Sequence, residues 1–332
     1  MSTLEQKTDL TISIVNMKNP EMVADCLRSI YRGTHAISME IWVVDNSKDG
    51  AGVPELQAEF PEVRWLVNDR QLGFSTNHNQ VLSRSTSRYA CILNDDVIVH
   101  DGAFDTLVKF MDDNPKVGMS GARLLNTDGS QQNCTFYFQT LKSELVGAVM
   151  LPGPLCHYKT IGINKAQFAS EVVDVDWVLG ACIVVRDTAL AQIGLLDDKM
   201  SPVANSEEVD WCMRAHKHGW RVTYCPDAVI THFGGQSTKP TSVGVNRMHV
   251  EMMRTRIAFF RKHYGLMPSV ALRAIYCLAL PWNALMLTQS LIRKHMEPDQ
   301  FKTALFTQWK VAAMSMWSPG RCVIAMPNFS SK

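Results

Sequence analysis

Three short polar clusters contain residue types that could carry out chemistry. The first is Asn94-Asp95-Asp96, which follows an apolar run. Two adjacent carboxylates suit a hard divalent cation, because such ions prefer oxygen ligands. A cation held there could bind a diphosphate and neutralise negative charge on a departing group. Asn and Asp also favour turns, so a simple turn is the alternative interpretation of this triplet.

The second cluster places three acids and a tryptophan within Ser206–Trp211. Acids at the start of a helix can simply stabilise the helix dipole, but this segment has more than a cap requires. Glu208 and Trp211 lie about one helical turn apart. A carboxylate partly desolvated by an indole could serve as a general base. Asp210 can pair with Arg214, which would make Asp210 structural.

The third cluster is His232-Phe233-Gly234-Gly235-Gln236-Ser237. A histidine placed after a strand and before two glycines can be a metal ligand, and a hydrogen-bonded loop residue is the alternative. Other catalytic signatures are absent from the sequence: it has no G-x-x-x-x-G-K phosphate loop, no H-E-x-x-H and no G-x-S-x-G.

An alternation of strand and helix patterns positions the first cluster. The expected strands are Leu10–Asn16, Ile41–Val44, Arg64–Val67, Tyr89–Leu93 and Val117–Ala122, with helical patterns between them. This alternation predicts an α/β fold with a mostly parallel sheet and helices on both faces. Ligands of such sheets bind beyond the carboxyl ends of the strands. Asn16, Asp45 and Asp96 all fall at such ends.

The second half of the chain has a weaker pattern. Between Leu124 and Asp176 we expect loops with short elements. The expected elements after it are a buried strand at Trp177–Arg186, a helix at Glu207–His218, short strands at Val222–Tyr224 and Ala228–Ile230, and a long basic helix at Val245–Tyr264. The second and third clusters therefore lie at the ends of elements, as the first does.

The segment Ala274–Ile292 carries no formal charge, and basic residues flank it on both sides. It approaches the length of a membrane span, ~20 residues. It also contains polar residues and Pro281, which favours a segment lying in the membrane interface over a full span. A helix packed on the rest of the protein is the other interpretation, and the sequence leaves the two open.

Composition limits the classes of function. The chain has 332 residues and a net charge of +1, so nothing in its charge favours nucleic acid as a partner. Its nine cysteines are scattered and form no C-x-x-C pair, which indicates reduced thiols in a cytosolic protein. The N-terminal residues are polar and charged and show no apolar signal segment, so we expect the catalytic part to lie in the cytoplasm.

Several segments, taken together and in order, carry a family resemblance. They are Thr11–Asn16, Val43–Ser47, Leu72–Asn79, Leu93–Asp96, Val175–Cys182, Glu207–Ala215 and His232–Ser237. This series, between about residues 10 and 240, resembles family 2 glycosyltransferases of the GT-A fold. Within that family it is most similar to the rhamnosyltransferase-like members of bacterial surface polysaccharide synthesis, such as O-antigen synthesis.

The resemblance implies a donor side of the site. Asp45, with Asn16 and Asn46 nearby, would hold the nucleobase and ribose of a nucleotide-sugar. His78 and Asn79 would lie near the donor end of the cleft. Met17, Lys18 and Gln71 differ from residues frequent in the family, which leaves the base and sugar of the donor open.

The resemblance also implies a metal. Asp96 would be the main ligand of Mg²⁺ or Mn²⁺, His232 would complete the site, and Asn94 is a further candidate. Asn94 stands where many members of the family have aspartate. Asp95, a candidate donor-binding residue, adds a charge that could compensate for this or face solvent.

On the acceptor side, the resemblance implies that Glu208 is the base that deprotonates the acceptor hydroxyl. Many relatives have aspartate there, with equivalent chemistry. The candidate residues of the sugar and acceptor pocket are Trp177, Gly180, Ala181, Glu207 and Trp211.

The resemblance thus predicts an inverting enzyme with a GT-A catalytic domain at residues 1–245, where 10–125 bind the donor and 170–240 supply the acceptor side and base. A helical C-terminal region, 246–332, would contact an anionic membrane. The donor is expected to be dTDP-rhamnose or a similar nucleotide-sugar, and the acceptor a glycan or lipid-linked glycan. The alternatives are a nucleotidyltransferase and a non-catalytic sugar-binding or scaffold protein of the same fold.

Overall fold

The computed structural model describes residues 7–17, 19–47, 50, 52–149, 170–200, 206–234, 242–293, 295 and 297–317. The chain divides into two compact units. The first comprises residues 1–137, 160–197 and 208–239, and the second comprises residues 138–159, 198–207 and 240–332. The second unit therefore takes a segment from the middle of the chain as well as the C-terminal region.

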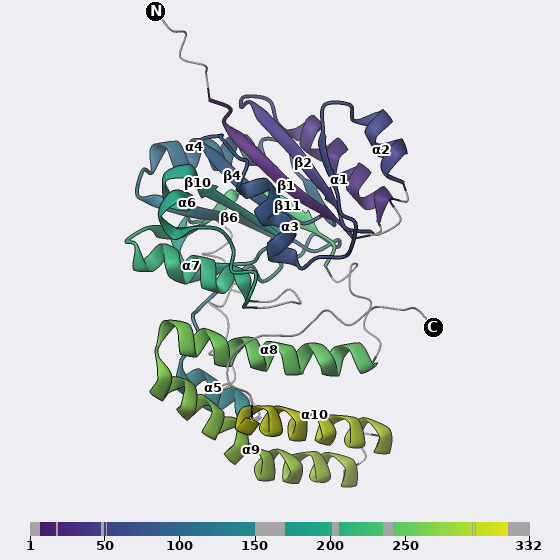
Figure 1. Cartoon of the computed structure of the whole chain (residues 1–332), viewed down its shortest axis with the longest axis vertical. Coiled ribbons are helices and arrows are strands. Elements are labelled where there is room, and N and C mark those ends of the chain that lie inside the picture. The colour runs from purple at the N-terminus through teal and green to yellow at the C-terminus, as the bar shows by residue number, and fades with distance from the viewer. Residues whose placement is uncertain are drawn as a thin grey trace, which may run out of the picture. The chain divides into compact units, whose positions relative to one another are not determined.

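A nine-stranded mixed sheet forms the centre of the first unit (Figure 1). Its strands are β1 (Leu10–Asn16), β2 (Met39–Asp45), β3 (Arg64–Val67), β4 (Tyr89–Leu93), β5 (Val97–Val99), β6 (Val117–Leu125), β8 (Val173–Asp174), β10 (Cys182–Arg186) and β11 (Arg221–His232). The order is β3-β2-β1-β4-β10-β6-β11-β5, with β8 paired to β11. A separate pair joins β7 (Thr135–Phe136) to β9 (Trp177–Val178).

Helices cover both faces of this sheet, so the expected fold class is confirmed. They are α1 (Pro20–Gly33), α2 (Val53–Glu59), α3 (Phe74–Leu82), α4 (Ala103–Asp113), α6 (Asp187–Ile193) and α7 (Glu207–Lys217). The chain moves outward from β1 to β2 and β3 and then returns to β4. Right-handed crossovers therefore place α1 and α3 on opposite faces. Every residue of β1 and β4 is buried, which explains why these strands are mostly apolar on both faces.

Strand β10 is the main departure from a parallel sheet. It lies between β4 and β6 and is antiparallel to both. The expected single strand at Trp177–Arg186 is wrong, because the chain turns at Gly180. The residues before this turn pair with β7, while those after it enter the main sheet.

Strand β11 also differs from expectation. Two short strands were expected here, but Arg221–His232 is one strand with an irregularity between Cys225 and Val229. It pairs in parallel with β6, and its last residues pair with β5 on the other side. This double pairing holds the C-terminal end of β11 inside the sheet.

The second unit contains α5 (Leu141–Ala148), α8 (Ser242–His263), α9 (Leu266–Ile292) and α10 (Pro298–Trp317). Its interior includes a polar cluster, in which Glu144 accepts hydrogen bonds from Arg256 at 3.2 Å and from the Tyr276 hydroxyl at 2.8 Å. Within the described residues, α9 is the one helix whose length and hydropathy would allow it to cross a membrane. It contains the whole uncharged segment and extends it by eight residues at its start.

The packing of β6 against β9 gives a test of the first unit. A methyl group added at Gly121 would lie 2.8 Å from Val178 Cβ and 2.9 Å from its Cγ1. Because a Val Cβ cannot move independently of its backbone, we expect Gly121→Ala to lower the free energy of unfolding by about 1–3 kcal/mol. The urea midpoint of unfolding measures this.

Gly180→Ala is the matched control, since its added methyl group would find its nearest neighbour at 3.7 Å. Its midpoint should stay close to that of the unaltered protein. Equal midpoints for the two variants would contradict this account of β6–β9 packing.

Candidate active site

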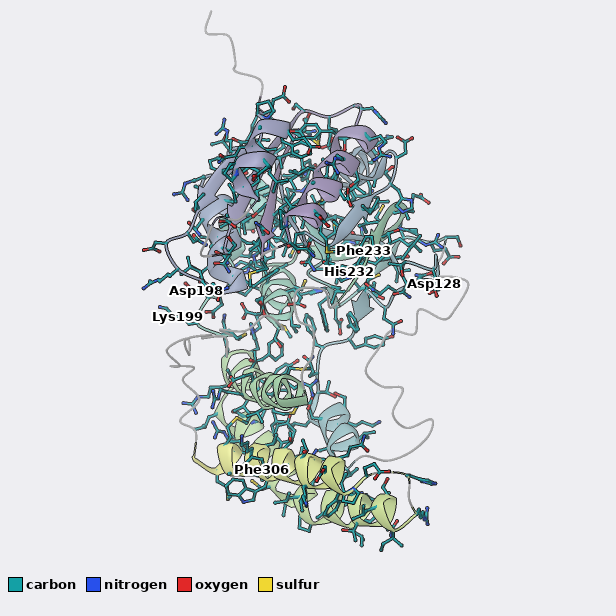
Figure 2. The ribbon with its side chains drawn as sticks, turned by 90° about the vertical axis from the view of Figure 1, so that its right-hand side faces the viewer. Asp128, Asp198, Lys199, His232, Phe233 and Phe306 are labelled. Carbon is teal, nitrogen blue, oxygen red and sulfur yellow. The ribbon has the colours of Figure 1, made fainter. Side chains whose placement is uncertain are left out.

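Four strands bring the sequence-predicted polar residues to one edge of the sheet. Asn16 ends β1, Asp45 ends β2, Asn94 follows β4 and His232 ends β11. Strands β1, β2 and β4 are mutually parallel, and β11 shares their direction because β10 is antiparallel to both β4 and β6. His232 and the neighbouring Phe233 are labelled in Figure 2. The first cluster and His232 of the third therefore meet at this edge, whereas Gly235, Gln236 and Ser237 of the third cluster lie outside the described residues.

Asp45 is fully buried at the end of β2. Its carboxylate accepts hydrogen bonds from Asn16 Nδ2 at 2.9 Å and from the Ser47 hydroxyl at 3.0 Å. The Asn16 side-chain oxygen in turn accepts from the Asn19 backbone N–H at 3.1 Å. This chain of bonds connects the ends of β1 and β2, which explains how a buried carboxylate is accommodated there.

Asn46 organises the loop that follows β3. Its side-chain oxygen accepts from the Leu72 backbone N–H at 2.8 Å and from Asn68 Nδ2 at 3.0 Å. Its amide nitrogen donates to the Leu72 carbonyl at 3.1 Å. Asn77 of α3 also accepts from Asn68, at 2.7 Å. Asn46 is thus a residue that positions the 68–73 loop, a role that only the folded chain reveals.

His78 and Asn79 both lie on α3 but have different surroundings. The His78 ring is completely buried, and its Nδ1 lies 2.8 Å from the Ser13 hydroxyl. Burial lowers the pKa of His78 to about 3, so the ring is neutral. The Asn79 side chain bonds both the N–H and the carbonyl of Leu196, at 3.0 and 2.8 Å. Asn79 therefore connects α3 to the segment after α6.

Asn94, Asp96 and His232 converge at the sheet edge. His232 Nε2 lies 3.1 Å from Asn94 Nδ2 and 3.3 Å from Asp96 Oδ1. Its other nitrogen, Nδ1, lies 2.7 Å from the side-chain oxygen of Gln132. Because that oxygen can only accept, Nδ1 donates to it, and Nε2 is the ring nitrogen that faces Asn94 and Asp96. Gln132 lies in a polar loop that gave no signal in the sequence.

Asp95 adds a second buried carboxylate beside Asp96. Its Oδ2 accepts a long hydrogen bond, 3.4 Å, from the Met17 backbone N–H. Burial, together with the negative charge of Asp96, raises the pKa of Asp95 to about 7. The sheet edge is therefore a place where added negative charge is costly and a cation would be stabilised.

The donor atoms at this edge fit a divalent cation. Among the described residues, Asp96 Oδ1 is buried and accepts no hydrogen bond, and it lies 3.3 Å from His232 Nε2. A buried carboxylate oxygen without a donor, next to an imidazole nitrogen, is a pair of groups that can serve as metal ligands. The hydrogen bond from His232 Nδ1 to Gln132 is the kind of outer contact that orients a ligating histidine. Within the described residues no cluster of three His, Cys, Asp or Glu side chains forms, so the third protein ligand would be the Asn94 amide.

Gly180 and Ala181 connect this edge to Glu208. The Asn94 backbone N–H donates to the Ala181 carbonyl at 3.0 Å. A methyl group added at Gly180 would lie 3.7 Å from the Glu208 carboxyl carbon. Glu208, on α7, is largely buried. The turn before β10 is thus bordered by Asn94 on one side and Glu208 on the other.

The other acids of α7 have separate positions. Asp210 is fully buried and pairs with Arg214 at 2.9 Å, as the spacing predicted. Glu207 is buried at the start of the helix. Trp211 is fully buried, and its Nε1 donates to the Gly194 carbonyl at 2.9 Å. Trp211 therefore packs in the interior of the first unit, beneath the helix that carries Glu208.

Trp177 belongs to the small β7–β9 sheet. Its ring stacks on Phe136 with centroids 4.1 Å apart, and its Nε1 donates to the Tyr137 carbonyl at 3.1 Å. It is half-buried, so part of the ring faces solvent close to the turn at Gly180.

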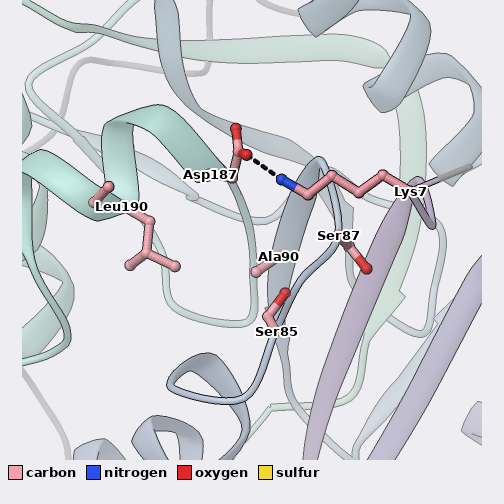
Figure 3. A pocket seen from close by; sticks show the side chains of 7 residues that line it. Lys7, Ser85, Ser87, Ala90, Asp187 and Leu190 are labelled. Atoms are coloured by element: carbon pink, nitrogen blue, oxygen red, sulfur yellow. Dashed lines mark hydrogen bonds and ion pairs between the residues drawn. The ribbon is translucent and has the colours of Figure 1, made fainter. Parts of the chain in front are cut away.

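A small cavity lies at the opposite edge of the sheet (Figure 3). It is lined by Lys7, Ser85, Ser87 and Asp187, among others. Lys7 precedes β1, the serines precede β4, and Asp187 follows the antiparallel β10. The cavity is therefore separate from the cluster around Asp96.

Comparison with known proteins identifies the family of the chain. The profile described as "Glycosyltransferase like family 2" matches residues 8–253. The chain therefore belongs to this family. The match includes the strands and all of the candidate site residues discussed above.

Curated relatives extend the similarity to rhamnosyltransferases. The N-acetylglucosaminyl-diphospho-decaprenol L-rhamnosyltransferases of two strains of Mycobacterium tuberculosis are each 26% identical over 212 residues. The aligned region covers 60% of this chain and 68% of each relative. An uncharacterized protein of Sinorhizobium fredii is 24% identical over 69% of this chain, which is 25% of its own length.

Solved structures support the fold. GalNAc-T7, solved with UDP, GalNAc and Mn²⁺, aligns with a TM-score of 0.52 at 13% identity, over 77% of this chain and 50% of its own. The mannosyltransferase PcManGT of Pyrobaculum calidifontis, solved with GDP-Man and Mn²⁺, also has a TM-score of 0.52, at 14% identity. That alignment covers 95% of this chain and 89% of the mannosyltransferase.

The positions on α7 predict which acid is structural. Asp210→Asn removes one partner of a buried ion pair, so we expect the free energy of unfolding to fall by about 3 kcal/mol. Glu208→Gln should change it by less than about 1 kcal/mol, because the substitution keeps shape at a position bordering an open turn. Chemical denaturation measures both, and a larger loss for Glu208→Gln would reverse the assignment.

Proposed function

We propose that the protein is an inverting, metal-dependent glycosyltransferase that moves a deoxysugar, rhamnose from dTDP-rhamnose, onto a hydroxyl group. The acceptor is a glycan or a lipid-linked glycan of cell-surface polysaccharide synthesis. The observation that carries this proposal is the connection of Asp96 and His232 to Glu208 through the turn at Gly180–Ala181. The similarity to rhamnosyltransferases supports the choice of sugar and of a lipid-linked acceptor.

The residues on the two sides of the Gly180–Ala181 turn have separate roles. Asp45, Asn16 and the loop positioned by Asn46 form the binding region for the nucleoside of the donor. Asp96 and His232, with Asn94, would hold Mg²⁺ or Mn²⁺, which when bound supplies positive charge to the diphosphate of the leaving group. Trp177 and the Gly180–Ala181 turn border the space for the sugar and the acceptor, where Gly180 leaves room beside the Glu208 carboxyl.

Glu208 acts as the general base. Its carboxylate takes the proton of the acceptor hydroxyl while the acceptor oxygen forms a bond to the anomeric carbon. The bond from that carbon to the diphosphate oxygen breaks in the same step, and the nucleoside diphosphate leaves. Attack from the side opposite the leaving group inverts the anomeric centre.

We place the reaction on the cytoplasmic side of a membrane, with the protein bound peripherally. The reduced cysteines support this location: the seven cysteines that the structure describes are free. A lipid-linked acceptor would require the active site to work close to a bilayer.

The role of Glu208 as the general base predicts that replacing it lowers the rate of turnover specifically. Glu208→Gln should lower kcat by roughly 100-fold or more while the KM for the donor changes little, because the amide cannot accept the proton. The assay follows release of nucleoside diphosphate from thymidine, uridine and guanosine sugar donors, with Mn²⁺ present. Glu55→Gln makes the same chemical change at an exposed position and should leave activity intact. Full turnover by Glu208→Gln would eliminate this residue as the base.

The metal site predicts a loss of cation binding. Even outer contacts of a metal ligand contribute about 10- to 100-fold to affinity, so Asp96→Asn should weaken Mn²⁺ binding at least tenfold. The Mn²⁺-dependent rise in thermal stability with a nucleoside diphosphate measures this. Asp128→Asn is the control, at an exposed turn (Figure 2). An unchanged Mn²⁺ response in Asp96→Asn would show that the cation binds elsewhere.

A further inference from the structure

Helix α9 exposes a row of large apolar side chains along its length. Its exposed large side chains are Met267, Val270, Leu278, Trp282, Leu285 and Ile292, together with Leu266 at its first residue. Five of them recur every three, seven or eight residues and so share one face of the helix. We call these five the outer stripe: Met267, Val270, Leu278, Leu285 and Ile292. It extends ~38 Å along the helix, given the rise of an α-helix.

The buried face of α9 combines apolar residues, Leu272, Ala279 and Leu287, with polar ones. Ser269 donates to the Ile257 carbonyl at 3.2 Å, and Tyr276 donates to Glu144 at 2.8 Å. Asn283 donates to the Ala148 carbonyl at 2.8 Å. Polar side chains thus contribute to the contacts that hold α9 to its neighbours, while its exposed large side chains are apolar. Such an exposed apolar face is unfavourable in water and favourable in contact with lipid.

The charge of the second unit fits an anionic surface. Residues 242–317 contain ten Lys and Arg residues but only three Asp and Glu residues, in a chain whose total charge is +1. Five exposed bases among the described residues lie near the ends of α8 and α9 or on α10: Arg261, Lys262, Arg293, Lys302 and Lys310. This excess of basic residues attracts the second unit to anionic lipid headgroups.

Aromatic residues on α10 add a second exposed cluster. Phe306, labelled in Figure 2, and Trp309 are each 54% exposed and stack with ring centroids 5.9 Å apart. Lys310 lies over the Phe306 ring at 4.5 Å. Aromatic and lysine side chains together are typical of the boundary between hydrocarbon and headgroups.

The packing of helices within the second unit argues against an α9 that crosses the membrane. Helix α9 contacts α5, α8 and α10. If α9 crossed the bilayer, the α8 segment against it, with Arg254 and Arg256, would enter the hydrocarbon as well. Charges there are costly. Lying in the plane of the membrane satisfies both helices, because only the outer stripe then enters the apolar layer.

We propose that the outer stripe of α9 binds an anionic lipid bilayer, with α9 lying in the plane of the interface. This deepens the peripheral location given under Proposed function and rests on it, but it does not depend on the chemistry at Glu208. The partner is the lipid surface itself, recognised through apolar burial and through the basic residues around the stripe.

Flotation of the full chain with vesicles tests this. The protein should float with vesicles of phosphatidylcholine and phosphatidylglycerol, bind less to phosphatidylcholine alone or at high salt, and be released by alkaline carbonate. Leu278 is 79% exposed and Leu285 is 50% exposed. Leu278→Glu combined with Leu285→Glu should lower vesicle affinity by about tenfold or more, since two large apolar groups lose their burial in lipid.

Two controls distinguish lipid binding from catalysis. Val172→Glu alters an exposed apolar residue of the first unit and should float normally. Glu208→Gln should lose turnover and still float, and the double Leu→Glu variant should retain slow donor hydrolysis, which shows that it folds. Normal flotation of the double variant would overturn the proposal, and so would resistance of the unaltered protein to carbonate. A dimer in lipid-free solution that the double variant abolishes would instead assign the stripe to a second copy of the chain.

Discussion

The active site depends on one strand that runs against its neighbours. Strand β10 enters the sheet between β4 and β6, and its first residues lie at the edge where the parallel strands end. The bond from the Asn94 N–H to the Ala181 carbonyl fixes that position. Because β10 enters the sheet here, residues from the second half of the chain border the same space as the polar residues after β4. Glu208 lies beside Gly180.

Electrostatics gives this edge its character. Asp95 and Asp96 are buried side by side, and Asp45 is buried at the end of a nearby strand. Asp45 is balanced by hydrogen bonds from Asn16 and Ser47, whereas the carboxylates after β4 have few donors among the described residues. The contrast separates a carboxylate satisfied by the protein from carboxylates that a cation would satisfy. His232, oriented by Gln132, completes that arrangement.

The second unit solves a different physical problem. Its polar groups, such as Glu144 and Asn283, face inward and pair with neighbouring helices. The exposed large side chains of α9 are apolar. The central strands β1 and β4 of the first unit are fully buried and mostly apolar. The two units thus differ in how their apolar side chains are distributed between interior and surface.

Local sequence determined the strands that alternate with helices, because β-branched runs and helical spacing act over a few residues. It also determined the polar residues at the ends of β1, β2 and β4, and the Asp210–Arg214 pair, which depends only on helical spacing. The antiparallel entry of β10, the continuity of β11 and the contacts of Gln132 and Asn46 were decided by tertiary structure alone. Each depends on residues about 25 to 140 positions apart, and no local pattern encodes which distant segment will pair with which. The same reason applies to α9: its composition showed an apolar segment, but only packing against α5, α8 and α10 decided which side chains face outward.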